Sequence, residues 1–279
     1  MTRFKAACVQ MRSGTDMAEN IAEATRLIEA AHTQGAQLIA TPEMTTLLEK
    51  SAAALFANAG TMETDPAIPA FTALAKRLSC WLAIGSVPII LGDGKCANRA
   101  LFISPEGELV THYDKIHMFD VTLGNGESYR ESKSYQPGER AVLVKTPLGG
   151  IGLSICYDLR FPHLHRDLAK AGADILMIPA AFTKVTGEAH WHVLQRARAI
   201  ETGCFVIAAA QGGHHQDGRD TYGHSMIIAP WGEVIAEAEN PEPGVICAEI
   251  DLEEVAKARG RVPALTHDRR YTLDVVEAG

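Results

Sequence analysis

Apolar residues recur along the chain in two patterns, as short continuous runs and as stretches with helical spacing. Residues 17–35 have the spacing of an amphipathic helix that closes at a glycine. The apolar face of this helix comprises Ile21, Ala24, Leu27, Ile28 and Ala31. Helices are also expected within residues 67–80, 163–173 and 188–203, and from Leu252 onward. Strands are expected within residues 4–11, 36–44, 81–90, 141–156, 174–182, 204–211, 224–230, 232–239 and 244–251, and a hairpin within residues 96–115.

Strands and helices alternate throughout, and no linker, repeat or change of composition divides them. This pattern predicts one α/β domain over residues 1–279. The strands are mostly continuous apolar runs, so each sheet should be covered on both faces. Residues 116–140 are irregular and rich in Gly, Ser and Glu, and loops of this length are often functional.

Composition narrows the class of protein. Apolar residues make up 47% of the 279 and charged residues 22%, which is ordinary for a soluble globular chain. The net charge of −8 gives no electrostatic support to a nucleic-acid partner. The longest apolar run, residues 81–91, is too short to cross a bilayer, so no membrane partner is expected. The six cysteines are scattered without a CxxC pair, which favours a reducing, cytoplasmic location.

Two glycine-rich motifs around residue 152 fail on inspection. The dinucleotide-binding pattern GxGxxG would need its third glycine at Ile155, and here the glycines precede a strand rather than a helix. A nucleophile elbow GxSxG would make Ser154 the nucleophile, but Cys156 replaces the closing glycine that permits the sharp turn. We therefore expect neither function.

The histidine pattern does not indicate a metal centre. No HExxH motif and no quartet of Cys and His ligands occurs. His163 and His165 are spaced so that they point apart on a helix, and ordinary surface or core roles suit them better. No metal site and no organic cofactor is expected.

Cys156 differs from the other cysteines in its surroundings, because it stands where an apolar strand ends and Tyr-Asp-Leu-Arg follows. A free cysteine is usually a small buried apolar residue. At a strand end, however, the thiol can protrude and the next backbone N–H can donate to an oxyanion. A cysteine nucleophile also needs a base and a cation nearby.

Two further charged residues follow buried strands. Glu43 comes after the strand within residues 36–44, and Lys115 ends the hairpin of residues 96–115. Either residue alone would usually be a solvated charge. Catalytic sites of α/β sheets lie beyond the carboxyl ends of the strands, so the three together predict one site.

These residues lie in segments that resemble the three signatures of the nitrilase superfamily, the carbon–nitrogen hydrolases. The segments are TPEM with Glu43, DKIHMFD with Lys115 and GLSICYDLRFP with Cys156, in the family's order and spacing. Residues 189–211 and 222–237 also resemble the family, and their sequence is most similar to its deaminated glutathione amidase branch. The resemblance implies a four-layer αββα sandwich and a homodimer or higher homo-oligomer.

The resemblance also implies a Glu-Lys-Cys triad. Cys156 would be the nucleophile, Glu43 the general base, and Lys115 with the N–H of Tyr157 the oxyanion stabiliser. A carboxylate beside a thiol disfavours the thiolate, and we expect the Lys115 ammonium to offset this and lower the thiol pKa. A second glutamate is implied at Glu131, within YRESK, with Glu127 as the alternative.

Other positions are candidates for substrate or subunit contacts. Arg160 either pairs with an acidic neighbour or binds a substrate carboxylate in bidentate fashion. Phe182 and Thr183 follow a strand and either face the pocket or pack in an ordinary loop. Trp191 and Arg198 are candidates for the dimer face, since aromatic and arginine side chains are enriched in interfaces.

The predicted activity is hydrolysis of a small carboxylate-bearing amide, such as deaminated glutathione, to an acid and ammonia through a thioester. An ω-amidase acting on α-ketoglutaramate is an alternative, and so are a nitrilase and an N-carbamoyl hydrolase. From another class comes a non-catalytic binding or scaffold protein on the same fold, which loss of triad residues would have favoured. All three triad residues are present.

Overall fold

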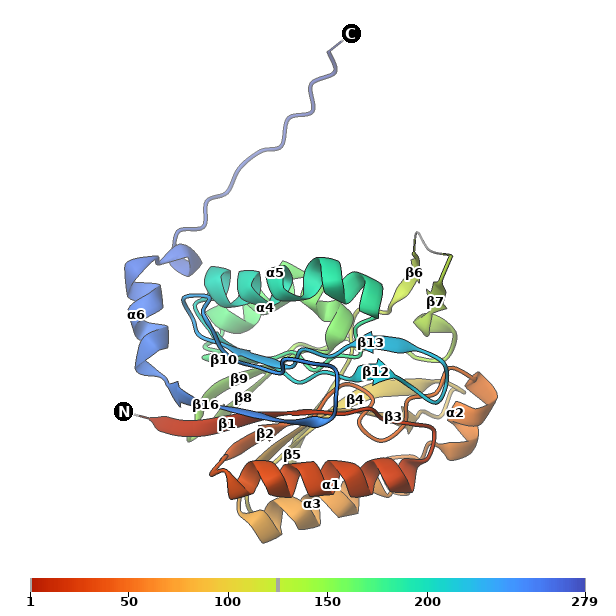
Figure 1. The fold of residues 1–279 in the computed structure, drawn as a ribbon. Helices are drawn as coiled ribbons and strands as arrows, with labels where there is room; N and C mark the ends of the chain where they lie inside the picture. Colours follow the sequence, from red (N-terminus) through yellow and green to blue (C-terminus); the bar gives the residue numbers. More distant parts are fainter. Residues whose placement is uncertain (1, 124–125, 279) are drawn as a thin grey trace.

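The computed structural model describes residues 2–123 and 126–278, and in it two β-sheets pack face to face between layers of helices (Figure 1). The first sheet has the order β16-β1-β2-β3-β4-β5. Its strands are β1 (Arg3–Gln10), β2 (Leu38–Ala40), β3 (Trp81–Ile90), β4 (Cys96–Ile103), β5 (Leu109–Asp114) and β16 (Gly244–Asp251). Strands β1, β2 and β3 are parallel, and the other pairings are antiparallel.

The second sheet has the order β15-β14-β11-β10-β9-β8. Its strands are β8 (Val142–Thr146), β9 (Gly149–Leu153), β10 (Ile175–Met177), β11 (Phe205–Ala208), β14 (Met226–Ile228) and β15 (Val234–Glu237). Strands β9, β10 and β11 are parallel, so their carboxyl ends meet at one edge. Two small hairpins pair β6 (Asp120–Thr122) with β7 (Ser128–Arg130), and β12 (Gly212–His214) with β13 (Asp220–Tyr222).

Helices form the outer layers. Figure 1 shows α1 (Met17–Thr33) and α3 (Ala67–Leu78) on one side of the sandwich, and α4 (Pro162–Lys170) and α5 (Lys184–Thr202) on the other. The shorter helices are α2 (Ala52–Asn58), α6 (Glu253–Arg261), η1 (Glu131–Lys133), η2 (Cys156–Arg160) and η3 (Ala264–Thr266). The predicted apolar face of α1 packs inward, and Asp16 caps this helix by accepting from the Glu19 N–H.

Apolar side chains from both sheets form the central core. Phe4 and Phe102 come from the first sheet, Ile151 and Phe205 from the second, and all four are buried in one cluster. A second cluster joins the first sheet to α1 and α3. The expected αββα sandwich is therefore confirmed, and the continuous apolar strands are explained by cover on both faces.

One expectation needs correction. Residues 116–140 are not irregular throughout, because they contain the β6–β7 hairpin and the turn η1. The Arg130 guanidinium donates to Val121 O at 2.7 Å and so supports this hairpin. Among the described residues, no helix is long and apolar enough to cross a membrane.

Candidate active site

The three strand-end residues converge where the two sheets meet. Glu43 lies three residues beyond β2 and Lys115 follows β5, both in the first sheet, and Cys156 lies three residues beyond β9 in the second. All three are buried. The peptide at Glu43 is fixed by the segment that follows β11, since the Gln211 side chain donates to Glu43 O at 3.0 Å.

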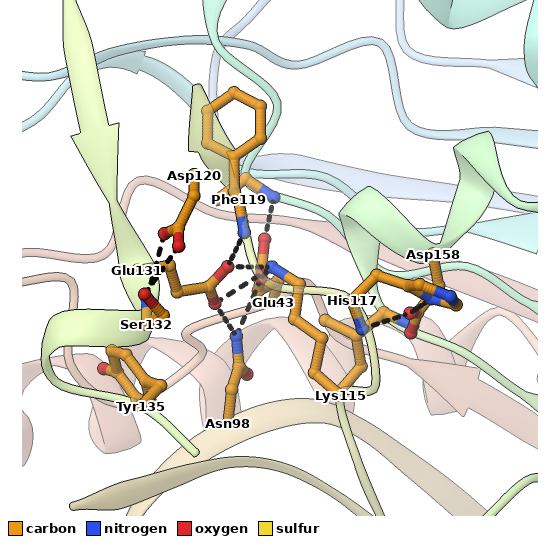
Figure 2. A network of polar contacts seen from close by, with 12 residues as sticks. Glu43, Asn98, Lys115, His117, Phe119, Asp120, Glu131, Ser132, Tyr135 and Asp158 are labelled. Atoms are coloured by element: carbon orange, nitrogen blue, oxygen red, sulfur yellow. Dashed lines mark hydrogen bonds and ion pairs between the residues drawn. The ribbon is translucent and has the colours of Figure 1, made fainter. Parts of the chain in front are cut away.

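Lys115 lies between two carboxylates (Figure 2). Its Nζ donates to Glu43 Oε1 at 2.9 Å and to Glu131 Oε1 and Oε2 at 3.0 and 2.9 Å. The Asn98 amide joins the same carboxylates, at 2.9 Å from Glu43 and 3.1 Å from Glu131. The ammonium thus occupies the position between the carboxylates that a bound cation would take.

The second glutamate of this network is Glu131. Its Oε2 also accepts from the Phe119 N–H at 2.6 Å, so the carboxylate is held on several sides (Figure 2). Glu127 lies elsewhere, where it accepts from the Tyr129 hydroxyl at 2.8 Å and lines a neighbouring outer cavity. The structure therefore places Glu131, and not Glu127, beside Lys115.

Cys156 occupies a tight turn. Its φ of +49° is in the left-handed region that non-glycine residues rarely adopt. Its own N–H donates to Pro179 O at 2.8 Å. The Tyr157 N–H belongs to the first turn of η2, where the helix itself offers no acceptor.

The charges around the thiol set its protonation. Burial raises the pKa of Cys156 well above its ordinary value, and the Glu43 carboxylate raises it further, while Lys115 only partly opposes both. As expected, Lys115 acts to lower the thiol pKa, but desolvation and Glu43 outweigh the ammonium, so the pKa of the resting thiol is raised overall.

Glu43 and Lys115 stabilise each other's charged forms. Burial by itself would raise the pKa of Glu43, but the charge and hydrogen bond of Lys115, with the thiol and the Ala181 N–H, lower it. Burial likewise opposes the charged form of Lys115, yet Glu131 and Glu43 hold the pKa of this lysine well above its ordinary value. The resting site thus holds a thiol, an ammonium and a carboxylate.

Asp158 fixes the turn that carries the nucleophile. Its carboxylate is fully buried and accepts from the Ile155 N–H at 2.9 Å and the Tyr113 hydroxyl at 2.6 Å. The other oxygen meets His117 through the backbone N–H at 3.0 Å and Nδ1 at 2.6 Å (Figure 2). Asp158 and Asn98 were not among the predicted residues.

A cavity of about 230 Å³ opens onto four residues of the site, namely Glu43, Lys115, Glu131 and Cys156. Tyr157, Phe182 and Thr183 line it, together with Phe119, Tyr129, Tyr135 and Arg219. Thr183 is also the N-cap of α5, where its side chain accepts from the Thr186 N–H. Arg160 does not line this cavity, because its guanidinium stacks on the ring of Phe182 at 5.2 Å and contacts His190.

The two residues expected on a dimer face are instead buried within the chain. Trp191 is fully buried and donates from Nε1 to His224 O at 2.8 Å. Arg198 is 5% exposed and donates from Nε to Leu159 O at 2.9 Å. That prediction was wrong, since both side chains face the second sheet and η2. Ser154, set aside as a nucleophile, is buried and donates to Met177 O.

Comparisons with known proteins agree with this geometry. Residues 5–260 match the carbon-nitrogen hydrolase family. The chain is 40% identical to the deaminated glutathione amidase of Synechocystis over 96% of its own length and 98% of the relative's, and 38% identical to the human one over 94% and 81%. The NitFhit structure of C. elegans superposes with a TM-score of 0.87 at 35% identity, covering 96% of this chain and 65% of that one. The structure of Saccharomyces cerevisiae Nit3, a member of the nitrilase superfamily, superposes with a TM-score of 0.86 at 30% identity. The match covers 96% of this chain and 97% of that one. The chain belongs to the carbon-nitrogen hydrolases of the nitrilase superfamily and is an enzyme of the amidase type.

Proposed function

We propose that this amidase hydrolyses deaminated glutathione, with Cys156 as nucleophile, Glu43 as general base and Lys115 as oxyanion stabiliser. The observation that carries the proposal is the buried network in which Lys115 Nζ bonds both Glu43 and Glu131 beside the Cys156 thiol. The likeness to deaminated glutathione amidases supports the substrate.

In the acylation half, Glu43 takes the proton of the Cys156 thiol as Sγ attacks the amide carbonyl. Because the pKa of the resting thiol is raised, proton transfer must accompany the attack rather than precede it. The oxyanion forms beside Lys115 Nζ and the Tyr157 N–H. Glu43 then returns the proton to the leaving nitrogen as the C–N bond breaks, which leaves a thioester.

In the deacylation half, Glu43 takes a proton from water, whose oxygen attacks the thioester carbonyl. The second tetrahedral intermediate collapses to the carboxylic acid, and the proton returns to Cys156 Sγ. Glu131 holds Lys115 in place throughout and keeps its ammonium protonated. No metal or organic cofactor enters this sequence.

The proposed substrate changes the product that we expected from the sequence. Deaminated glutathione is a secondary amide, so its cleavage yields 2-oxoglutarate and the dipeptide cysteinylglycine rather than ammonia. The dipeptide needs room beyond the thiol. The outer cavity shares Lys50, Arg219 and Asp220 with the inner one and adds Lys184 and Glu127, so charges of both signs lie along this path. Arg219 is paired with Asp217, which leaves Lys50 and Lys184 as the candidate cations for the substrate.

The test compares deaminated glutathione, α-ketoglutaramate, an aliphatic amide and a nitrile, with Cys156→Ala as control. We expect the highest kcat/KM for deaminated glutathione, equal release of 2-oxoglutarate and dipeptide, and no turnover by the variant. Preference for α-ketoglutaramate would indicate an ω-amidase instead. Turnover that survives in Cys156→Ala would refute the nucleophile. A folded protein inactive on all four would refute the proposed substrate.

We further propose that the enzyme is a homo-oligomer in a reducing compartment. Val193 and Ile200 project from one face of α5 with exposures of 69% and 56%, and the indole of Trp231 is also exposed. All six cysteines are unpaired in the structure. Light scattering should give a mass of at least twice 30.1 kDa, reduced in Val193→Glu but not in Val110→Glu on β5. A monomeric wild-type enzyme would refute the assembly.

A further inference from the structure

A second cluster of chemically reactive side chains lies outside the catalytic cavity. His192 of α5, His224 before β14 and Glu237 of β15 converge, although they are widely separated in the sequence. His192 Nε2 lies 2.7 Å and His224 Nδ1 lies 3.0 Å from the same oxygen, Glu237 Oε1. The three donor atoms all lie within 4.8 Å of one another. None of the three residues lines the catalytic cavity.

The donor set is typical of a transition-metal site. Two imidazole nitrogens and one carboxylate oxygen are the ligands found in many three-ligand zinc sites that keep a fourth position for water. Ligands on a tetrahedral zinc ion lie about 3.3 Å apart, given bond lengths of about 2.0–2.1 Å. The observed nitrogen–oxygen separations, 2.7 and 3.0 Å, are shorter than this value, so the side chains must rotate slightly apart to admit the ion.

Neighbouring groups hold the two rings in place. Tyr222 stacks on the His224 ring at 4.4 Å between centroids, and it meets His192 edge-on at 6.0 Å. The backbone of His224 is fixed by the Trp191 indole, which donates to His224 O. His224 also has φ +55°, a conformation that a non-glycine residue adopts only when its surroundings impose it. The site is thus largely preformed.

The charge balance also favours a cation. Across residues 2–123 and 126–278, the ion-pair partners of Glu237 are the two histidines, and no Lys or Arg nitrogen lies within 4.0 Å of its carboxylate. Each imidazole must carry a proton on the nitrogen that faces Glu237 Oε1 for both hydrogen bonds to form. A divalent ion would replace those two protons and bond the same three atoms.

We propose that His192, His224 and Glu237 bind a divalent transition-metal ion, with Zn²⁺ the best fit to two nitrogens and one oxygen. The bound ion would join α5 to β14 and β15. Thr183, the N-cap of α5, and Thr186, in its first turn, line the catalytic cavity, so the ion would stabilise that wall from a distance. The sequence pattern does not show this site, because its ligands come from three separate segments.

The test uses Zn²⁺ and Co²⁺ alone as probes on full-length Cys156→Ala protein, which removes the catalytic thiol as a competing ligand. Equilibrium dialysis gives the stoichiometry, Co²⁺ absorption reports the ligand geometry, and thermal unfolding reports the stabilisation. The ligand variants are His192→Gln, His224→Asn and Glu237→Gln. Asparagine suits position 224 because it tolerates the left-handed conformation. His214→Asn is the matched control, since His214 pairs with Asp220 away from the site.

We expect one ion per chain, a Co²⁺ spectrum of a four-coordinate site and a metal-dependent rise in Tm. Each ligand variant should weaken binding at least tenfold and abolish the rise in Tm, and the control should retain both. Circular dichroism of the metal-free variants checks that they fold. The proposal fails if no ion binds, if the ligand variants bind as tightly as the parent, or if His214→Asn weakens binding equally.

Discussion

Lys115 Nζ donates to both carboxylate oxygens of Glu131, at 3.0 and 2.9 Å, and so binds Glu131 more fully than it binds Glu43. This bidentate contact leaves Glu43 with one oxygen on Lys115 and the other on the Ala181 N–H. Glu131 therefore supplies much of the negative charge that stabilises the Lys115 ammonium. Glu43 is the carboxylate that raises the pKa of the thiol.

The first prediction concerns Glu131→Gln. The amide keeps the shape of the side chain but removes the charge that holds the ammonium, so the oxyanion stabiliser loses its position. We expect kcat to fall by roughly 100- to 1,000-fold with little change in KM, as for loss of an oxyanion donor. Glu127→Gln, in the same loop but outside the network, should change kcat less than about threefold. Equal losses in both variants would overturn the assignment of Glu131.

The second prediction concerns the Cys156 thiol and separates protonation from catalysis. Glu43 raises the thiol pKa, so Glu43→Gln should lower it and shift the pH profile of Cys156 alkylation to lower pH. The same variant should lose amide hydrolysis, because no base remains to shuttle the proton. Alkylation at Cys156 is followed by peptide mass spectrometry, which separates it from the other five cysteines.

Glu49→Gln is the matched control for this experiment. Glu49 lines the same cavity, but its carboxylate accepts from the Ser51 N–H and does not bond the thiol. The alkylation profile of Glu49→Gln should match that of the parent. A profile for Glu43→Gln that moves to higher pH would contradict the proposed role of Glu43 in the resting site.

The third prediction concerns Asp158, which we regard as a positioning residue. In Asp158→Asn one carboxylate oxygen is replaced by an NH₂ group, which cannot accept a hydrogen bond. The buried groups that donate to that oxygen therefore lose their acceptor. We expect about 2–3 kcal/mol of destabilisation in urea unfolding and a lower kcat, since the turn at Cys156 loosens. Tyr113→Phe removes a single donor and should cost less in both measurements. A stable Asp158→Asn enzyme with unchanged kcat would refute this role.

Strand ends made much of the site predictable from sequence. Glu43 and Cys156 each follow an apolar strand of a parallel set, whose carboxyl ends meet at one edge of the sheet. Lys115 instead follows the antiparallel hairpin strand β5. Glu131 could be predicted only through the family resemblance, because its loop has no periodicity that fixes where it folds. Asn98 was missed although a signal existed, since Asn98 and Arg99 are polar residues inside an otherwise apolar strand.

The error at Trp191 and Arg198 has a physical cause. Aromatic and arginine side chains are enriched in interfaces, but they also occur in a protein core when their polar groups are hydrogen-bonded there. Composition alone therefore does not distinguish the two locations. Helical periodicity would have been the better guide, because Trp191, Gln195, Arg198, Ala199 and Thr202 lie on one face of α5 and are all buried. The exposed face carries Val193 and Ile200 instead.

The fourth prediction is that both sheets unfold together, as one domain. The central core takes side chains from β1 and β4 of one sheet and from β9 and β11 of the other, so each sheet alone would expose its inner apolar face. Calorimetry at fixed protein concentration should show one transition with no early loss of either sheet. Two resolved transitions, or a stable proteolytic fragment holding a single sheet, would contradict a single domain.

The fifth prediction tests how the outer cavity contributes to substrate choice. Lys50 is exposed and lines both cavities, on the side where the dipeptide end of deaminated glutathione would lie. Lys50→Met should raise KM for deaminated glutathione roughly fivefold, since an exposed ion pair with the terminal carboxylate has modest strength. KM for α-ketoglutaramate, which lacks the dipeptide, should stay unchanged. The difference should shrink at high salt because exposed charges are screened. Lys76→Met, on α3, is the control and should leave KM unchanged for both substrates. If Lys50→Met changes KM for both substrates, Lys50 lies nearer the reacting amide than we propose.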